Sequence, residues 1–307
     1  MRTDIIAVAK QALTTALAIK RSDRVLVLTD RNKQSLAEIF YRAAQQITNT
    51  VDLALMAETG QHGKEPTDDI AARMLDYDVI IAVTTYSLTH THALRRAKQR
   101  ARIASLPDFT AAMFGALAVD YDQLKSDCLR LADVLQHGNE VRITTLSGTD
   151  LTFSIEGCQI NPSYGIVEDK GVVNLPDGEV FLPPKEMNGA LVIDFYPGIA
   201  NAAVMIHANR IVRFSDTEGG TSFKELLSAD DGALNVAEFG IGTNKSATLI
   251  GNILMDEKVL GTAHVAFGNN LGFGGTNNSS IHIDVILMKP TIVIDGNTIM
   301  KDGDSLW

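Results

Sequence analysis

The sequence predicts an α/β plus α+β organisation, in which an N-terminal parallel-sheet domain is followed by a β-rich domain. Up to about residue 140, helical periodicity alternates with short apolar runs, which is typical of a parallel sheet covered by helices. Beyond that point short strand-like runs and turn residues predominate. A length of 307 residues is sufficient for two ordinary domains. We therefore expect a Rossmann-like domain over 1–140 and a β-rich domain over 141–307.

The apolar pattern indicates the elements of each domain in order. In the first domain they are a helix over 3–20, a strand over 24–28, a helix over 33–48, strands over 51–55 and 78–83, and a helix over 120–136 that Gly138 can cap. In the second domain they are strands over 141–145, 151–155 and 191–195, and helices near 221–227 and 247–254.

Composition excludes several classes of partner. The formal net charge is -10 and the pI is about 5.1, whereas nucleic acid and anionic membranes attract basic surfaces. Cys128 and Cys158 are too few for a disulfide framework. No run approaches 18 apolar residues, and the N-terminus leads directly into an amphipathic helix. We expect a cytoplasmic protein with a peptide or small-molecule substrate.

Glycine placement argues against a dinucleotide cofactor. The turn after the first strand, 29–33, contains no glycine that would let a pyrophosphate approach the backbone. The glycines that do cluster, in 268–275, lie between two strand-like runs. We interpret them as a flexible loop beside the site described next, with direct anion binding as the alternative.

The most informative feature is the pair His282 and Asp284. Because strand side chains alternate, both point to one face of the expected strand, while Ile281, Ile283 and Val285 point to the other. A divalent cation satisfies a buried imidazole and a buried carboxylate together. The alternative is that Asp284 only orients His282 within an ordinary polar network.

Other polar residues interrupt apolar runs in the same half of the chain. His264 lies in an apolar strand-like run upstream of His282, and Glu179, Glu238 and Glu257 each interrupt another apolar stretch. Each is either a metal ligand or a buried polar group that needs another partner. This company favours a metal-binding catalytic role for the second domain.

Two histidines follow the strand over 78–83. His90 and His92 lie at its carboxyl end and at the start of a helix, where open α/β sheets bind ligands. They do not share a helical face, which argues against joint metal ligation. One of them, His92 in particular, is a catalytic candidate that could hold substrate or move a proton. The alternative is helix-entry polarity with Thr89 as the N-cap.

The order of these motifs resembles the metal-binding series of the M29 (aminopeptidase T, thermophilic) metallopeptidase family. The motifs that carry the resemblance lie at 174–181, 237–240, 256–257, 264–268 and 280–284. The resemblance implies a homodimeric metalloprotease with two zinc or cobalt ions per chain, which removes N-terminal residues from short peptides. It also implies six metal-site residues, namely Glu179, Glu238, Glu257, His264, His282 and Asp284, with Glu238 as the bridge.

From first principles, four carboxylates offset the charge of two divalent ions that activate water. Glu179 and Glu257 are also catalytic candidates, because a glutamate not needed as a ligand can relay a proton to the leaving amine. Family peptidases carry a tyrosine shortly after the histidine that matches His264, where this chain has Asn269, Asn270 and Leu271. If that tyrosine stabilises the tetrahedral intermediate, this departure argues against peptidase activity.

A second resemblance, less close, is to the 2,5-dihydroxypyridine ring-opening dioxygenases, which use a single Fe(II) ion. It implies a two-histidine, one-carboxylate facial triad formed by His264, His282 and Asp284, with open positions for substrate and dioxygen. His90 or His92 would then act as the acid or base. This alternative leaves Glu238 and Glu257 without a role as ligands.

Overall fold

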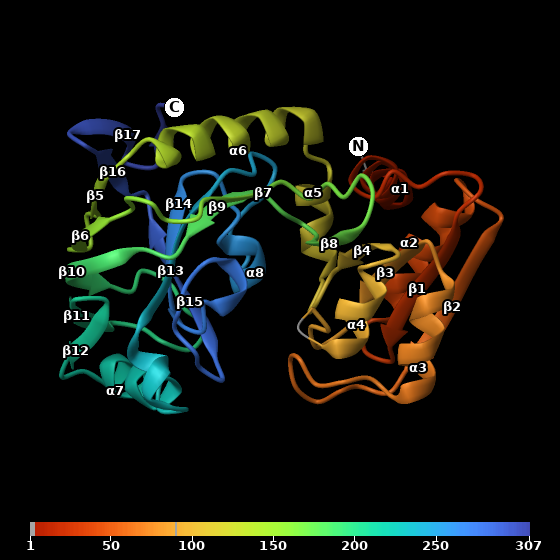
Figure 1. Ribbon diagram of the computed structural model, residues 1–307, viewed down its shortest axis with the longest axis horizontal. Helices are drawn as coiled ribbons and strands as arrows, with labels where there is room; N and C mark the ends of the chain where they lie inside the picture. Colours follow the sequence, from red (N-terminus) through yellow and green to blue (C-terminus); the bar gives the residue numbers. More distant parts are fainter. Residues whose placement is uncertain (1–3, 90) are drawn as a thin grey trace. The chain divides into compact units, whose positions relative to one another are not determined.

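The structure, a computed structural model, describes residues 4–89 and 91–307, which divide into two compact units (Figure 1). Unit 1 contains the chain up to Tyr121 together with Gly165–Asp177, and unit 2 contains Asp122–Tyr164 and Gly178–Trp307. Where the sequence suggested one division near residue 140, the chain passes between the units three times. Each unit is described below by itself.

Unit 1 is built on the expected parallel sheet. Its strands are β1 (Arg24–Asp30), β2 (Thr50–Met56), β3 (Val79–Val83), β4 (Arg102–Ser105) and β8 (Gly171–Asn174), in the order β2-β1-β3-β4-β8. All four strand pairs are parallel. Its helices are α1 (Ile5–Ala16), α2 (Gln34–Gln45), α3 (Asp68–Arg73), α4 (His92–Ala97) and α5 (Phe114–Leu117), with the short 3-10 helices η1 (Met74–Asp76) and η2 (Ala111–Met113).

Local chemistry explains the bounds of α1. The Asp4 carboxylate accepts hydrogen bonds from the backbone N–H groups of Ile6 and Ala7, so it caps the start of the helix. Ala18 has a positive φ of 44°, which no α-helix accommodates, so the helix stops at Ala16 and is shorter than the expected 3–20. The side chains of β3 are buried along its whole length, as a covered parallel strand requires.

Unit 2 is β-rich, as expected. An eight-stranded sheet has the order β12-β11-β10-β6-β5-β16-β17-β18, and a five-stranded sheet, here called the site sheet, has the order β15-β14-β13-β9-β7. The strands are β5 (Glu140–Thr144), β6 (Asp150–Ser154), β7 (Asn161–Ser163), β9 (Glu179–Leu182), β10 (Lys185–Val192), β11 (Ala203–His207), β12 (Arg210–Phe214), β13 (Val236–Gly242), β14 (Thr262–Gly268), β15 (His282–Met288), β16 (Thr291–Ile294), β17 (Asn297–Lys301) and β18 (Asp304–Ser305).

The helices of unit 2 are α6 (Tyr121–Gln136, whose first residue belongs to unit 1), α7 (Glu218–Leu226) and α8 (Ile253–Asp256), with the 3-10 helices η3 (Asp231–Leu234) and η4 (Leu271–Phe273). The expected helix over 247–254 is wrong, since only Ile253–Asp256 is helical. Gly251 has a φ of 81°, and the Asp256 carboxylate accepts hydrogen bonds from the N–H groups of Ile250 and Gly251. This local turn replaces the first part of the helix.

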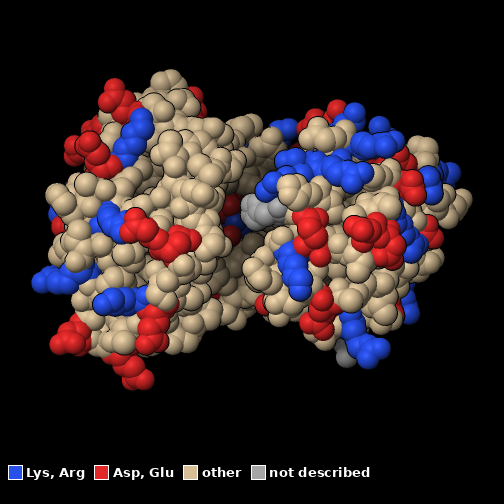
Figure 2. Space-filling model, turned by 60° about the horizontal axis from the view of Figure 1, so that its bottom comes forward, with Lys and Arg blue, Asp and Glu red and all other residues tan. Residues whose placement is uncertain are grey.

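Charged side chains of both signs lie on the surface. On the face shown in Figure 2, acidic and basic side chains are interspersed on both units. Within the described residues, no helix is both long enough and apolar enough to cross a bilayer.

Candidate metal centre

The site sheet gathers five of the six predicted metal-site residues on one face. Its strands pair antiparallel, and in such pairs residues directly opposite each other point to the same side. The register pairs Glu179 with Gly242, Glu238 with Ala266, Gly240 with His264, Ala266 with Asp284 and Gly268 with His282. Period-two alternation along β13, β14 and β15 therefore places Glu179, Glu238, His264, His282 and Asp284 on a common face.

Two glycines of β13 leave room for this cluster. A Cβ at Gly240 would lie 2.1 Å from His264 Nε2, and one at Gly242 would lie 2.8 Å from the carbonyl oxygen of Glu257. Both separations are far below van der Waals contact. The space that these glycines leave is occupied by the imidazole of His264 and by the turn that carries Glu257, the sixth predicted residue.

Glu238 lies at the centre of the cluster and faces both histidines. Its Oε1 is 3.2 Å from Nε2 of His264, and its Oε2 is 3.5 Å from Nε2 of His282. Nε2 of His282 is also 3.4 Å from Oδ1 of Asp284. A shift of register between Val236 and Glu238 marks a bulge immediately before this glutamate, and such bulges re-aim a side chain beside a site.

A buried lysine joins the two remaining glutamates. Lys258 Nζ lies 2.5 Å from Oε1 of Glu179 and 2.6 Å from Oε1 of Glu257, and its side chain is only 2 % exposed. Oε2 of Glu179 is buried without a hydrogen-bond partner among the described residues and is 3.6 Å from Nε2 of His264. Lys258 therefore binds one oxygen of Glu179 and leaves the other directed toward His264.

The concentration of charge shifts the pKa values of the histidines upward. Burial acts to lower the pKa of His264, but its hydrogen bond with Glu238 and the charges of Glu179 and Glu257 outweigh burial and raise it to about 9. Burial is likewise outweighed at His282, where the charge of Asp284 raises the pKa to about 10.

The pKa values of the carboxyl groups shift in both directions. Burial raises the pKa of Glu179 to about 8 despite the nearby Lys258, and it also raises the pKa of Glu257. At Asp284 the burial effect is outweighed by the charge and hydrogen bond of His282, which lower the pKa to about 2. In the metal-free site the carboxyl groups and the imidazoles therefore share protons, and strongly shifted pKa values of this kind are typical of functional sites.

The donor set fits a divalent metal. Among the described residues three groups of ligand atoms lie within 4.8 Å of one another, namely Glu179, Glu238 and His264; Glu238, His282 and Asp284; and Glu257, His264 and Asp284. Carboxylate oxygens and imidazole nitrogens are ligands of zinc and cobalt. The unpartnered Oε2 of Glu179 is a buried acceptor of the kind that an ion would satisfy.

A second layer of contacts orients His282. Its Nδ1 lies 2.8 Å from the backbone oxygen of Asn269, which favours the tautomer with the proton on Nδ1 and leaves Nε2 to face Glu238 and Asp284. The buried Asn270 donates a hydrogen bond from Nδ2 to the oxygen of Ala237 and accepts one at Oδ1 from the N–H of Asn277. The loop that we interpreted as flexible is therefore tied to β13 by side-chain hydrogen bonds.

The two candidate histidines of the first half of the chain, His90 and His92, belong to unit 1, whereas this cluster belongs to unit 2. His90 lies outside the described residues. His92 is the first residue of α4, and Thr91, not the expected Thr89, caps this helix by accepting a hydrogen bond from the N–H of Leu94. The Glu65 carboxylate accepts hydrogen bonds from the N–H groups of His92 and Ala93. The catalytic role of His92 stays a prediction.

The sequence reasoning missed Lys258. The sequence does show three consecutive charged residues, Asp256, Glu257 and Lys258, shortly before an apolar strand. A lysine next to a glutamate ordinarily indicates a solvated turn, so nothing in the pattern separated a buried cation from a surface one. Gly240 was missed because its importance depends on the register of β13 against β14.

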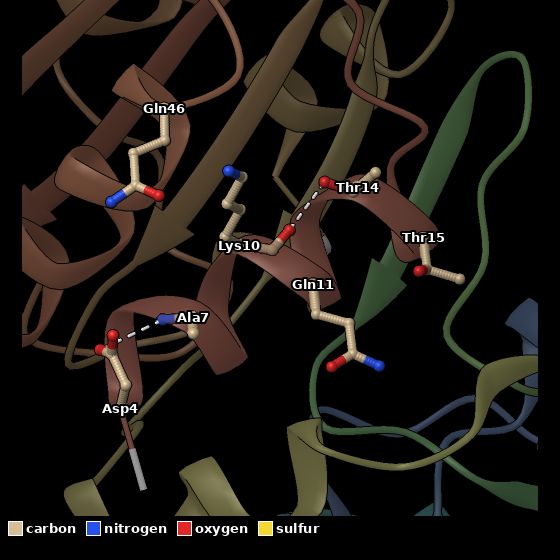
Figure 3. A pocket seen from close by; sticks show the side chains of 7 residues that line it. All are labelled: Asp4, Ala7, Lys10, Gln11, Thr14, Thr15 and Gln46. Carbon is tan, nitrogen blue, oxygen red and sulfur yellow. Dashed lines mark hydrogen bonds between the residues drawn. The ribbon is translucent and has the colours of Figure 1, made fainter.

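A hollow elsewhere in the molecule has no such chemistry. A surface depression of about 410 Å³ lies along α1 in unit 1, and its lining includes Asp4, Lys10, Gln11 and Gln46 (Figure 3). Asp4 is already engaged as the cap of α1, and Thr14 donates a hydrogen bond to the backbone oxygen of Lys10. This depression lacks a cluster of metal-ligating groups.

The sequence is similar to proteins of two activities. The family model described as NicX, 2,5-dihydroxypyridine 5,6-dioxygenase, matches residues 4–306. Aminopeptidase 2 of Geobacillus stearothermophilus is 29% identical over 157 residues, which cover 42% of this chain and 37% of that enzyme. The chain thus spans little more than a third of the length of this curated relative.

Two solved structures share the fold. The 2,5-dihydroxypyridine dioxygenase of Pseudomonas putida KT2440 superposes with a TM-score of 0.81 at 16% identity, over 100% of this chain and 98% of its own. AmpT of Thermus thermophilus superposes with a TM-score of 0.73 at 14% identity, over 99% of both chains. At these identities the likeness establishes the fold, and the two resemblances seen in the sequence are both confirmed.

Proposed function

This chain belongs to the NicX family, described as 2,5-dihydroxypyridine 5,6-dioxygenase, and within it we propose a metal-dependent hydrolase of the aminopeptidase type. In this proposal the protein removes N-terminal residues from short peptides, or cleaves a related amide, with two divalent ions held by the site sheet. Zinc or cobalt is the proposed ion because the ligands are carboxylates and imidazoles. The similarity to Aminopeptidase 2 supports the same reading.

The arrangement of Glu238 carries the proposal. Its two carboxylate oxygens face two different histidines, and it belongs to two of the three ligand groups. A carboxylate in this position is suited to bridge a pair of ions. The facial triad of the dioxygenase alternative, His264, His282 and Asp284, is not among the groups that gather within 4.8 Å in the described part of the chain.

The residues of this chain have distinct tasks in the proposed reaction. Bound divalent ions would supply an activated water nucleophile and polarise the scissile carbonyl. Glu179, Glu238 and His264 would hold one ion, and Glu238, His282 and Asp284 the other. Glu257, held by Lys258 through Oε1, is the proposed proton carrier to the leaving amine. Burial of Glu179, Glu238, Glu257 and His264 limits competing contacts of these groups with water.

A mononuclear Fe(II) ring-opening dioxygenase is the second candidate function. The family match over nearly the whole chain favours it. The Lys258 ammonium also favours it, because a fixed positive charge between Glu179 and Glu257 already compensates two carboxylates. Under this candidate a single ion would be held by His264, His282 and Asp284, and Glu238 would be a neighbour of the ion instead of a bridge.

Metal stoichiometry separates the two candidates. The protein would be loaded with zinc, cobalt or Fe(II) in parallel, and ions per chain measured by elemental analysis after removal of excess metal. The hydrolase proposal expects two zinc or cobalt ions per wild-type chain, at most one in Glu238→Gln, and release of p-nitroaniline from amino acid p-nitroanilides. The exposed Glu140→Gln serves as the matched control and should retain both ions.

Other results would favour the dioxygenase candidate or refute the aminopeptidase proposal. One iron per chain, oxygen uptake with a dihydroxypyridine, and metal retention in Glu238→Gln would establish the dioxygenase candidate. Full zinc occupancy with no cleavage of p-nitroanilides or dipeptides would refute the aminopeptidase proposal. The homodimer and the cytoplasmic location expected from the sequence remain part of the proposal, and light scattering of the loaded protein tests the former.

A further inference from the structure

Two aromatic side chains adjoin the metal centre on the same side of the site sheet. Phe181 follows Glu179 by two residues on β9 and pairs with Gly240, so it shares the face of the metal-site residues. Phe273 belongs to η4, and its ring lies 5.4 Å from the ring of Phe181 in an edge-to-face arrangement. The ring of Phe273 is also 5.8 Å from the imidazole of His282, again edge to face. The two phenylalanines are here called the aromatic wall.

Hydrogen bonds from Asn161 fix the backbone at both residues of the aromatic wall. Asn161 on β7 donates hydrogen bonds from Nδ2 to the backbone oxygens of Phe181 (3.4 Å) and Phe273 (3.2 Å). Gly274, with a φ of 100°, lies so close to Gln159 that an added Cβ would be 2.7 Å from the Gln159 Cβ. The strand that carries one ring and the loop that carries the other are thus joined through β7, and ordered loops that lie next to reactive groups commonly select substrates.

The chemistry of the wall contrasts with that of its neighbours. Both rings are only half-buried, whereas Glu179, Glu238 and His264 beside them are buried. A half-buried aromatic pair beside a polar cluster offers apolar area that an apolar group of a ligand can cover. A small side chain, such as the hydrogen of glycine, would cover almost none of this surface.

We propose that Phe181 and Phe273 form the subsite for an apolar or aromatic side chain, carried by the substrate residue whose polar groups engage the metal centre. The inference rests on the proposed function for the identity of that residue, which is the N-terminal amino acid of a peptide. Contact with the wall would favour leucine or phenylalanine over glycine at this position. Discrimination by an apolar pocket amounts to roughly 10-fold or more per group buried.

The test measures binding, so that it does not depend on turnover. Leucine hydroxamate and glycine hydroxamate carry the same metal-binding group and differ only in the side chain. Their dissociation constants would be measured by calorimetry on zinc-loaded protein, with zinc content determined for every sample. The wild type should bind leucine hydroxamate at least about 10-fold more tightly, and Phe273→Ala should reduce this ratio to below about 3-fold at unchanged zinc content. The matched control is Phe214→Ala, a half-buried phenylalanine on β12 of the other sheet, which should preserve the ratio.

A second variant is needed because Phe273 contacts His282, so that its loss can disturb metal binding. If Phe273→Ala loses zinc, Phe181→Ala, whose ring contacts Phe273 instead of His282, provides the same comparison. A ratio near unity in the wild type, or an unchanged ratio in the zinc-replete variants, would overturn the inference. A clear leucine preference that Phe273→Ala abolishes, without hydrolysis of any p-nitroanilide, would support the subsite and reject only the aminopeptidase activity.

Discussion

Replacing Lys258 with methionine tests the electrostatic description of the site most directly. Methionine is similar in volume and removes the positive charge that holds Glu179 and Glu257 at 2.5 and 2.6 Å. Because the lysine side chain is 2 % exposed, water cannot replace it. Loss of one partner from a buried ion pair costs about 3–5 kcal/mol, since the other charge remains buried without compensation. We expect the free energy of unfolding of the metal-free protein to fall by this amount at about pH 9, above the Glu179 pKa of about 8.

The assay is urea unfolding of protein stripped of metal with a chelator, followed by circular dichroism. Lys245→Met is the matched control, because Lys245 pairs with Asp127 while its side chain is 55% exposed, and such a pair contributes at most about 1 kcal/mol. The loss in Lys258→Met should shrink as the pH falls below about 8, because Glu179 is then protonated and needs no cation. The reasoning is refuted if the two lysine variants unfold with the same free energy at about pH 9, where Glu179 is ionised.

The remaining predictions concern the histidines and their surroundings. Gly240→Ala should lower the free energy of unfolding by about 1–3 kcal/mol through overpacking and reduce zinc content, because the new Cβ would lie 2.1 Å from His264 Nε2. The control is Gly272→Ala, whose added Cβ would have no heavy atom within 4 Å. Equal melting temperatures for the two variants would contradict the register of β13 against β14. The melting temperature of metal-free protein should fall as the pH rises from about 6.5 to 10. The folded-state pKa values of His264 and His282, about 9 and 10, exceed the ordinary 6.5, so the stabilisation by the protonated histidines is complete below pH 6.5 and is lost as the pH rises through those values. A melting temperature that stays constant over this range would show that neither histidine is protonated. Added zinc should raise the midpoint more at pH 8 than at pH 6, since the ion displaces protons from the same nitrogens, and a shift independent of pH would argue against imidazole ligation.

The sequence was sufficient for the elements whose signal is local. The alternation of helical and apolar runs predicted the parallel sheet of unit 1, and the polar residues within apolar strands identified the residues that gather on the site sheet. His282 and Asp284 share a face as strand periodicity required. These predictions succeed because a polar group in an apolar run is conspicuous whatever the tertiary structure.

What the sequence could not provide depends on contacts between distant segments. The strand β8 joins the parallel sheet beside β4 although about 65 residues separate them in the chain, and a four-residue apolar run carries no sign of this pairing. The helix expected over 247–254 was displaced by hydrogen bonds to Asp256, and the cap of α4 lies at Thr91, two residues beyond the expected one. The burial of Lys258 likewise follows from the position of Glu179 on a different strand.

The interleaving of the two units constrains how the protein can be made or cut. Because β8 is the last strand of the parallel sheet, a ribosome must synthesise α6, β5, β6 and β7 before that sheet can close. A fragment that ends near residue 140 would expose the backbone edge of β4, which invites aggregation. To express the N-terminal half alone, a copy of residues 165–177 must therefore be attached to it, so that β8 can cover the edge of β4 as it does in the 307-residue chain.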